Sequence, residues 1–484
     1  MTTLGLTGCT LASTDSDPTP SPTATKHPFT VMSTDPIRVV DPAAVTEPGS
    51  AVLTENVFQR LMTAAPGADV LKPDAARDCL FTAATVYTCT LNQELEFSNG
   101  HPLTSSDIKF SIERATRLAV PGSSASLLSS LRRIETPDPL TARFVLSRVD
   151  TQFGWALASP AASVVDEELY DADEVQAGSD PIIGSGPFTV TAIDASSVKL
   201  SRFENYVGRT PARMGSLVYR TAQDSAAIEA AMTAGTVDVV WRGLSSAALI
   251  RLSQQVRSSA EELTADRFSL RTLPGIRVRQ LLWNPSSANR NNPALRRALP
   301  VALQEDRTSD SVVPAGIPGH TSSFAAGGNA TPKVSWSNRI QLTLGYDATM
   351  PDGRDLANQI RTRLEDTGGL SVRVRPDDPS ADLQLVDRKA WTATALAWLQ
   401  PYLDSPLAGS RPTVSALETK YRASTQDGEA LQLLAALQDR AALDAVVLPV
   451  SQGDENLLVR AGVEVSETSW GPGWQLGLFG MKDG

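Results

Sequence analysis

The chain has 484 residues, a length at which two or more domains are expected. Its hydrophobic fraction of 41% and charged fraction of 20% are normal for a globular protein. The net charge of −11 argues against nucleic acid as a partner, because phosphates attract clusters of Lys and Arg. No apolar run of about 18 residues occurs, so the sequence predicts no membrane-spanning segment.

The N-terminal segment resembles a lipoprotein lipobox. Leu6-Thr7-Gly8-Cys9 places a cysteine after an apolar and two small residues, and residues 10–28 are rich in Thr, Ser, Pro and Asp, as in an extended tether. Only eight residues precede Cys9, and none is Lys or Arg, whereas a signal peptide needs a basic start. Either the start of the sequence is misplaced or truncated, or the match to a lipobox is accidental. We expect Cys9 to carry a lipid anchor.

The remaining two cysteines stand in strand-like surroundings. Cys79 and Cys89 are flanked by apolar and β-branched residues, and residues 82–84 suit a turn between two antiparallel strands. A disulfide between them would imply an oxidising compartment, whereas the alternative is two free buried thiols. We expect the disulfide.

The folded part alternates strand and helix patterns. A capping-box-like Thr104-Ser105-Ser106-Asp107 predicts the start of a helix, and Gly235 predicts the end of another. In chain order we expect strands at 29–40, around Cys89, at 142–146, 188–193, 198–203, 237–241, 281–284, 340–346, 370–375 and 446–450, and helices at 52–62, 105–115, 225–233, 293–299, 352–366 and 428–443. This order predicts two α/β lobes, with a ligand cleft between them.

Several segments together resemble the peptide/nickel class of ABC-transporter solute-binding proteins. The strongest match is Leu91–Arg114, which contains Phe97-Ser98-Asn99-Gly100-His101-Pro102-Leu103-Thr104 and then a helix ending in Glu113-Arg114. Weaker matches follow in the order that the family shows, namely Gly184–Phe188, Glu204–Gly208, Ala227–Val240 and Asn284 with Pro293–Leu299.

The resemblance implies an α/β, two-lobed fold like that of periplasmic binding proteins, with an extra subdomain in the first lobe. We expect the first lobe to begin after the tether and the chain to return to it near its end. The expected parts are 1–28 for lipobox and tether, 29–55, 176–270 and 405–484 for the first lobe, 56–175 for the extra subdomain, and 271–404 for the second lobe.

The resemblance also implies where a ligand binds. Peptide-binding members have a Trp-x-x-Asp segment whose Asp pairs with the ligand's α-amino group. Here the matching segment contains Trp398, Pro401, Tyr402 and Asp404, so Trp398 and Tyr402 match while Pro401 stands where the Asp is expected. Either Asp404 serves from a shifted position, or the ligand has no free amine.

Further candidate ligand contacts lie at the expected lobe edges. They are Thr34 and Asp35, which precede the turn at Asp41-Pro42, Trp241 and Arg242 at the end of a buried strand, and Asn284 at the start of the second lobe. Each has an ordinary structural alternative: core packing for the tryptophans, a structural hydrogen bond for Asn284 and a loop or cap role for Asp404.

The function expected from the resemblance is that of a lipid-anchored, extracytoplasmic solute-binding protein. Its expected partners are an oligopeptide-like solute and the membrane subunits of an ABC importer, and we expect a monomer without cofactor or bound metal. A metal chelate, haem or an oligosaccharide is an alternative ligand, and a scaffold or sensor with a degenerate pocket is an alternative role. We do not expect an enzyme, because the only histidines are His27, His101 and His320, and Gly-x-Ser-x-Gly and His-Glu-x-x-His are absent.

Overall fold

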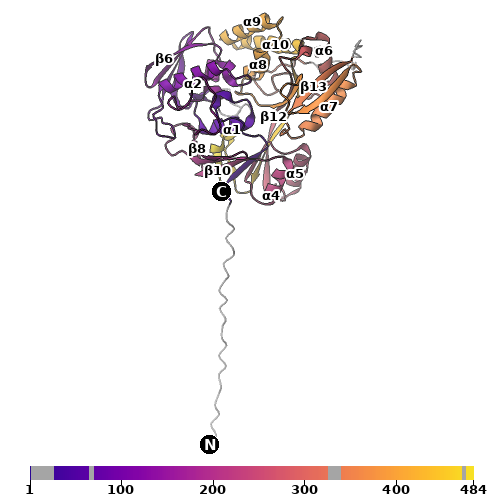
Figure 1. The fold of residues 1–484 in the computed structure, drawn as a ribbon. Coiled ribbons are helices and arrows are strands. Elements are labelled where there is room, and N and C mark those ends of the chain that lie inside the picture. The colour runs from indigo at the N-terminus through magenta and orange to yellow at the C-terminus, as the bar shows by residue number, and fades with distance from the viewer. Residues whose placement is uncertain (2–26, 65–69, 325–338, 471–475) are drawn as a thin grey trace.

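The protein consists of two lobes and a smaller subdomain, arranged around one large mixed β-sheet (Figure 1). The structure is a computed structural model and describes residues 1, 27–64, 70–324, 339–470 and 476–484. Cys9, the expected site of the lipid anchor, therefore lies outside the described residues. Among the helices of the described ranges, none is both long and apolar enough to cross a membrane.

Two long antiparallel strands run through both lobes and form the hinge. They are β12, Phe268–Trp283, and β16, Val447–Arg460, which pair from Phe268↔Arg460 to Leu282↔Val447. Ten strands make up the sheet, in the order β14-β13-β15-β12-β16-β11-β1-β10-β9-β8. The hinge strands thus join the sheet of the second lobe on one side to that of the first lobe on the other.

The first lobe occupies the lower part of Figure 1, where β8, β10, α4 and α5 are labelled. Apolar residues of its strands and of α1 form one core, and α4 and α5 cover a second, smaller one. Its elements are β1 (Thr30–Ser33), β8 (Phe188–Ile193), β9 (Ser197–Arg202), β10 (Ser216–Thr221), β11 (Val239–Trp241), α1 (Pro48–Val57), α4 (Ser225–Thr233), α5 (Ser246–Ser258), β17 (Glu464–Val465) and β18 (Met481–Lys482).

The glycines of the Gly184–Phe188 segment have a packing reason. A Cβ on Gly184 would lie 2.1 Å from the carbonyl oxygen of Val57, and one on Gly186 would lie 2.5 Å from the carbonyl carbon of the same residue. Only a residue without a side chain lets this segment lie against the end of α1.

The extra subdomain has its own four-stranded sheet, in the order β4-β5-β7-β6, and its own core. The expected capping box is confirmed at the start of α2, where Thr104 N–H donates to Asp107 and Ser106 N–H donates to Thr104. The elements are β2 (Met62–Thr63), β3 (Lys72–Pro73), β4 (Ala76–Ala83), β5 (Val86–Leu91), β6 (Leu131–Asp138), β7 (Thr141–Leu146), α2 (Ser105–Leu118), α3 (Phe153–Ala156) and the 3-10 turn η2 (Ser124–Leu128).

Cys79 and Cys89 face each other in this sheet. They are paired residues of the antiparallel strands β4 and β5, with Cα atoms 4.1 Å apart, and they form a disulfide. The predicted antiparallel hairpin and disulfide are present, and the turn lies at residues 84–85 rather than at 82–84.

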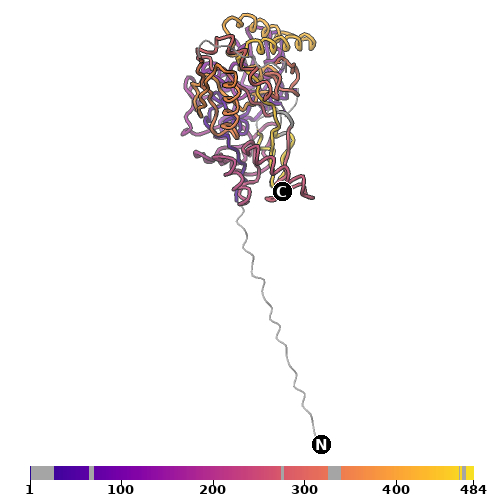
Figure 2. Tube along the Cα trace, turned by 90° about the vertical axis from the view of Figure 1, so that its right-hand side faces the viewer, coloured from indigo at the N-terminus to yellow at the C-terminus, as the bar shows by residue number. Residues whose placement is uncertain are grey.

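The second lobe differs from the expected boundaries. Val414, Tyr421, Leu434 and Ala441, in two helices that we expected in the first lobe, belong to the second lobe's core. Figure 2 shows these helices at the opposite end of the molecule from the C-terminus. The chain returns to the first lobe only along β16. The elements are β13 (Ile340–Tyr346), β14 (Leu370–Pro376), β15 (Leu383–Arg388), α6 (Pro293–Ala302), α7 (Gly353–Glu365), α8 (Ala395–Asp404), α9 (Arg411–Ala423) and α10 (Asp427–Asp444).

Candidate ligand-binding cleft

Three adjoining cavities lie between the lobes and form one cleft. The central cavity, of about 220 Å³, has walls from the first lobe, the extra subdomain and the second lobe. It shares Val386 and Asp387 with a cavity of about 350 Å³, which we call the acidic cavity because six carboxylates line it. It shares Pro401 and Asp404 with a third, outer cavity of about 760 Å³, which lies between η2 and the end of α8.

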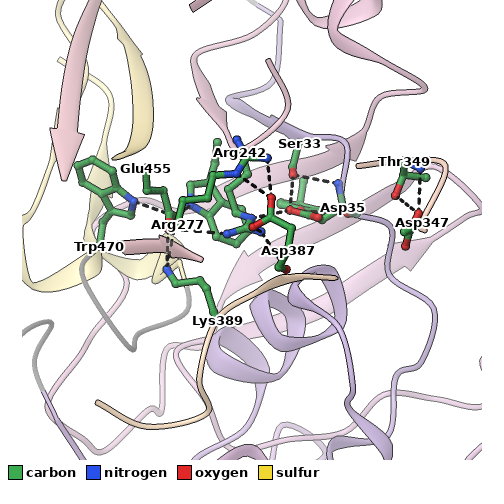
Figure 3. A network of polar contacts seen from close by, with 12 residues as sticks. Ser33, Asp35, Arg242, Arg277, Asp347, Thr349, Asp387, Lys389, Glu455 and Trp470 are labelled. Carbon is green, nitrogen blue, oxygen red and sulfur yellow. Dashed lines mark hydrogen bonds and ion pairs between the residues drawn. The ribbon is translucent and has the colours of Figure 1, made fainter. Parts of the chain in front are cut away.

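A buried arginine joins the two lobes at the floor of the cleft (Figure 3). Arg242 follows β11 and has a positive φ of 58°. Its Nε lies 3.1 Å from Asp35 of the first lobe, and its Nη2 lies 3.1 Å from Asp387 on β15 of the second. Its Nη1 lies 3.8 Å from Glu455 on the hinge strand β16. One side chain therefore contacts carboxylates from both lobes and from the hinge.

Two further cations complete this hinge network. Arg277 on β12 lies 2.6 Å from Asp387, and Lys389, just beyond β15, lies 3.4 Å from Glu455. With Arg242, the network holds three cations and three carboxylates. Because these charges balance, the floor of the cleft needs no charge from a ligand.

The electrostatics of the network follow from burial and pairing. Burial raises the pKa of the Asp387 carboxyl, but the neighbouring charges of Arg242 and Arg277 outweigh it, so that pKa is well below its usual range. Burial dominates at Asp35, whose pKa is raised despite Arg242. Burial also lowers the pKa of the Lys389 ammonium more than its carboxylate neighbour raises it. Asp387 is therefore the firmly ionised anion of the second lobe.

Four of the eight predicted site residues lie in or beside the cleft. Asp35 lines the acidic cavity, and Asp404 is exposed where the central and outer cavities meet. Arg242 is buried in the hinge network. Trp241 lies beneath that network, with its indole N–H donating to Glu455 and its ring 5.4 Å from the Arg242 guanidinium carbon. Asp35, Trp241 and Arg242 are neighbours at the hinge network, whereas Asp404 lies at the end of α8, and Asp35 and Asp404 are the two that line a cavity.

The other four predicted site residues line none of the three cavities and take no part in the hinge network. Trp398 and Tyr402 are 2% and 0% exposed in the core of the second lobe, and the Tyr402 hydroxyl donates to Asp444 at 2.7 Å. Asn284 donates to two backbone carbonyls, at 3.1 and 3.2 Å, and holds a turn. Thr34 is buried, with 1% exposure. Trp398 thus packs in a core and Asn284 makes a structural hydrogen bond, although Asn284 also lines a further cavity of about 240 Å³ beside Pro401.

The cavity wall contains residues that the sequence did not single out. Trp391 lines the central cavity just beyond β15, and Arg388, Lys389 and Gln400 line it too. Trp391 begins an earlier Trp-x-x-polar run, in which Thr394 takes the fourth position. Thr394 caps α8 by accepting a hydrogen bond from the Ala397 N–H at 3.3 Å. Neither Trp run therefore offers a carboxylate in that position.

Arg388 compensates for a proline inside α8. Pro401 has no N–H, so the carbonyl of Ala397 loses its helical hydrogen bond. Arg388 donates instead, from Nη2 to Ala397 O at 2.6 Å and from Nη1 to Trp398 O at 2.7 Å. Burial lowers the pKa of this guanidinium to about 10, against the opposing effect of the Asp404 charge. Arg388 and Pro401 together therefore fix this wall of the central cavity.

We expect the cost of losing Arg388 to depend on Pro401. Arg388→Met should lower the free energy of unfolding by about 2–4 kcal/mol, because two buried carbonyls lose their donor. In a Pro401→Ala background the helix regains an N–H for Ala397, so the same change should cost about 1 kcal/mol less. Urea unfolding of the four proteins in this double-mutant cycle measures the coupling, and additive costs would contradict the compensation.

The family assignment rests on a match over most of the chain. The model of the bacterial extracellular solute-binding proteins, family 5, matches residues 71–411. A probable D,D-dipeptide-binding periplasmic protein of Escherichia coli is 25% identical over 272 residues, covering 54% of this chain and 50% of its own. A glutathione-binding protein of Salmonella typhimurium is 23% identical over 219 residues, covering 45% and 40%. The chain thus spans about a third to a half of the length of the curated relatives it matches.

Solved structures share the fold over nearly the whole chain. A periplasmic binding protein (PBP) from A. tumefaciens in complex with agropinic acid has a TM-score of 0.81 at 19% identity, covering 94% of this chain and 98% of its own. A dipeptide-binding protein from Pseudoalteromonas sp. in complex with Met-Leu has a TM-score of 0.78 at 16% identity, covering 94% and 100%. The predicted two-lobed α/β fold is confirmed, and the chain belongs to the bacterial extracellular solute-binding proteins, family 5.

Proposed function

We propose that this protein is the extracytoplasmic solute-binding component of an ABC importer and captures an extended, oligopeptide-like solute between its lobes. The observation that carries the proposal is a free strand edge inside the cleft. β13 pairs with β15 only from Leu383 to Leu385, whereas β12 pairs with β15 as far as Arg388. One edge of residues 386–388 therefore lacks a strand partner within the described part of the chain.

A free edge of this kind is suited to main-chain recognition. Val386 and Asp387 line both the central and the acidic cavity, so the edge faces the space where a ligand would lie. An extended peptide can add to such an edge through its own N–H and C=O groups, while the surrounding pockets receive its side chains. Main-chain pairing makes modest demands on side-chain chemistry, which agrees with the balanced charges of the hinge network.

The proposed mechanism is closure without chemistry. Ligand bound to one lobe is sealed by the other, and the closed population grows by the difference in affinity between the two forms. Contacts such as Arg38–Asp347, at 2.9 Å between the lobes, then belong to the closed form. The importer's membrane subunits would recognise that form, and no covalent step is required of the protein.

Ligand-dependent stability and compaction test the proposal. A mixture of tri- to pentapeptides should raise the melting temperature in proportion to the logarithm of peptide concentration above Kd, and should lower the radius of gyration in small-angle X-ray scattering. Peptides with alternate amides N-methylated should bind more weakly, because they cannot pair with the β15 edge. Equal binding of methylated and unmodified peptides, or no response to any peptide, would count against the proposal.

A non-peptide solute is the second candidate. It is favoured by the lack of a carboxylate at both Thr394 and Pro401, and one fold relative is solved with agropinic acid. Mass spectrometry of small molecules that co-purify with the native protein separates the two candidates.

We propose that the protein lies outside the cytoplasm and is anchored by a lipid on Cys9. We also propose that it is a monomer. The Cys79–Cys89 disulfide supports an oxidising compartment. Intact mass before and after reduction tests the disulfide, and labelling with a radioactive fatty acid, lost in Cys9→Ala, tests the anchor.

A further inference from the structure

Two hydrogen-bond acceptors on one face of α8 point to a cationic group in the ligand. Gln400 and Asp404 are four residues apart, which places them on the same side of the helix, and both line the central cavity. Gln400 is 4% exposed, and its Nε2 donates to Ser123 O at 2.9 Å and to Ser126 Oγ at 2.6 Å. Its Oε1 has no hydrogen-bond partner. A buried acceptor of this kind is rare, because leaving it unpaired is unfavourable.

Asp404 supplies a negative charge beside that acceptor. Its side chain is exposed and lines both the central and the outer cavity. Within the described ranges no cation forms a salt bridge with its carboxylate. The nearby Arg388 is held by the carbonyls of Ala397 and Trp398 and does not pair with it. Asp404 therefore offers a carboxylate to a donor that comes from the cleft, and the buried, unpartnered Gln400 Oε1 lies on the same face of the helix.

The position of Asp404 distinguishes an internal from a terminal cationic group. The central cavity of about 220 Å³ opens on one side of this residue and the outer cavity of about 760 Å³ on the other. A ligand whose cation lies at this junction can continue in both directions. A terminal α-amine would leave one of the two cavities empty.

We propose that Gln400 and Asp404 bind the ammonium group of a lysine-like side chain within an extended ligand. This inference rests on the proposed function and narrows its ligand to peptides with a basic internal residue. The proposed contact does not involve the α-amino group of the peptide. A peptide with a blocked N-terminus should therefore bind as well as one with a free N-terminus.

The test compares two N-acetylated, C-amidated tripeptides, Ala-Lys-Ala and Ala-norleucine-Ala, by isothermal titration calorimetry. Norleucine keeps the aliphatic stem and lacks the ammonium. The wild-type protein should bind the lysine peptide about tenfold or more tightly than the norleucine peptide. The reason is that hydrogen bonds from the charged ammonium group add to the binding free energy. Asp404→Asn should abolish that preference, and Asp404→Glu should retain part of it.

Controls separate the site from general charge and from folding. Asp439→Asn removes a carboxylate from an exposed position of α10 and should leave the preference unchanged. Thermal melting shows whether each variant is folded. If both peptides bind equally to the wild type, or if Asp404→Asn keeps the preference, this inference is overturned while the proposed function stands. If neither these tripeptides nor longer unmodified peptides bind, the proposed function itself fails.

Discussion

Replacing Arg242 by methionine is expected to lower the free energy of unfolding by about 3–5 kcal/mol, because it removes one partner of a buried ion-pair network. Arg242 contacts Asp35, Asp387 and Glu455, and its side chain is 2% exposed. Methionine fills much of the same volume and supplies neither charge nor donor. Three buried carboxylates would then face the two remaining cations.

The cost of this substitution should depend on pH. In the wild type the pKa of Asp387 is lowered, so its pairing stabilises the fold above the unfolded pKa of about 4, and this contribution is lost as pH falls further. Without Arg242, burial is opposed by less positive charge and the pKa of Asp387 rises. The difference in the free energy of unfolding between the wild type and the variant should therefore become smaller as pH is lowered from 7 towards 5.

Guanidinium chloride unfolding at pH 5, 6 and 7 measures both effects. Arg251→Met is the matched control, because Arg251 pairs with Glu229 at the surface and is 51% exposed. That change should cost at most about 1 kcal/mol and should show no comparable pH dependence. Equal costs for the two substitutions would show that the hinge network contributes no more than a surface pair.

Local features of the fold could be read from the sequence. The capping box at Thr104 and Asp107 involves adjacent turns of chain, so residue types at fixed spacing were sufficient. The Cys79–Cys89 hairpin is local for the same reason. Helix α10 was also expected, but its lobe was not. An amphipathic pattern shows that a helix has an apolar face and does not show which core receives it.

The cleft depended on contacts that sequence spacing does not encode. Trp391 and Trp398 each begin a Trp-x-x-x run, with Thr394 and Pro401 in the fourth position, and it is Trp391 that lines the central cavity. Arg242 meets partners that are 207 and 145 residues away along the chain. Both features arise from the pairing of distant strands, which no local motif specifies.

A second buried ion pair joins the second lobe to the extra subdomain, outside the hinge network. Arg422 on α9 of the second lobe lies 2.9 Å from Asp150 of the extra subdomain, and their side chains are 3% and 0% exposed. The Ser130 hydroxyl donates to the same carboxylate at 2.7 Å, and the Thr151 N–H donates to Arg422 O at 2.7 Å. Opening the lobes would separate these partners, so the pair stabilises the closed form selectively.

Arg422→Met should therefore weaken ligand binding without touching the ligand. It leaves Asp150 buried and unpaired in the closed form, at a cost of about 3–5 kcal/mol, whereas water solvates that carboxylate in the open form. The apparent affinity falls with the closed fraction, by about 100-fold for a cost near 3 kcal/mol. Isothermal titration calorimetry with a peptide that binds the wild type measures the loss of affinity. Small-angle X-ray scattering without peptide should show a larger radius of gyration for the variant than for the wild type.

Two comparisons decide whether the pair acts through closure. Arg363→Met removes an ion pair with Asp306 inside the second lobe, 2.6 Å in length, and should change stability without changing affinity. Combining Arg422→Met with Asp150→Leu replaces the pair by apolar groups and should recover most of the affinity, because no buried charge is left unpaired. If Arg422→Met lowers stability and leaves both affinity and radius of gyration unchanged, the two lobes keep this contact in the open form, and the extra subdomain moves with the second lobe rather than closing against it.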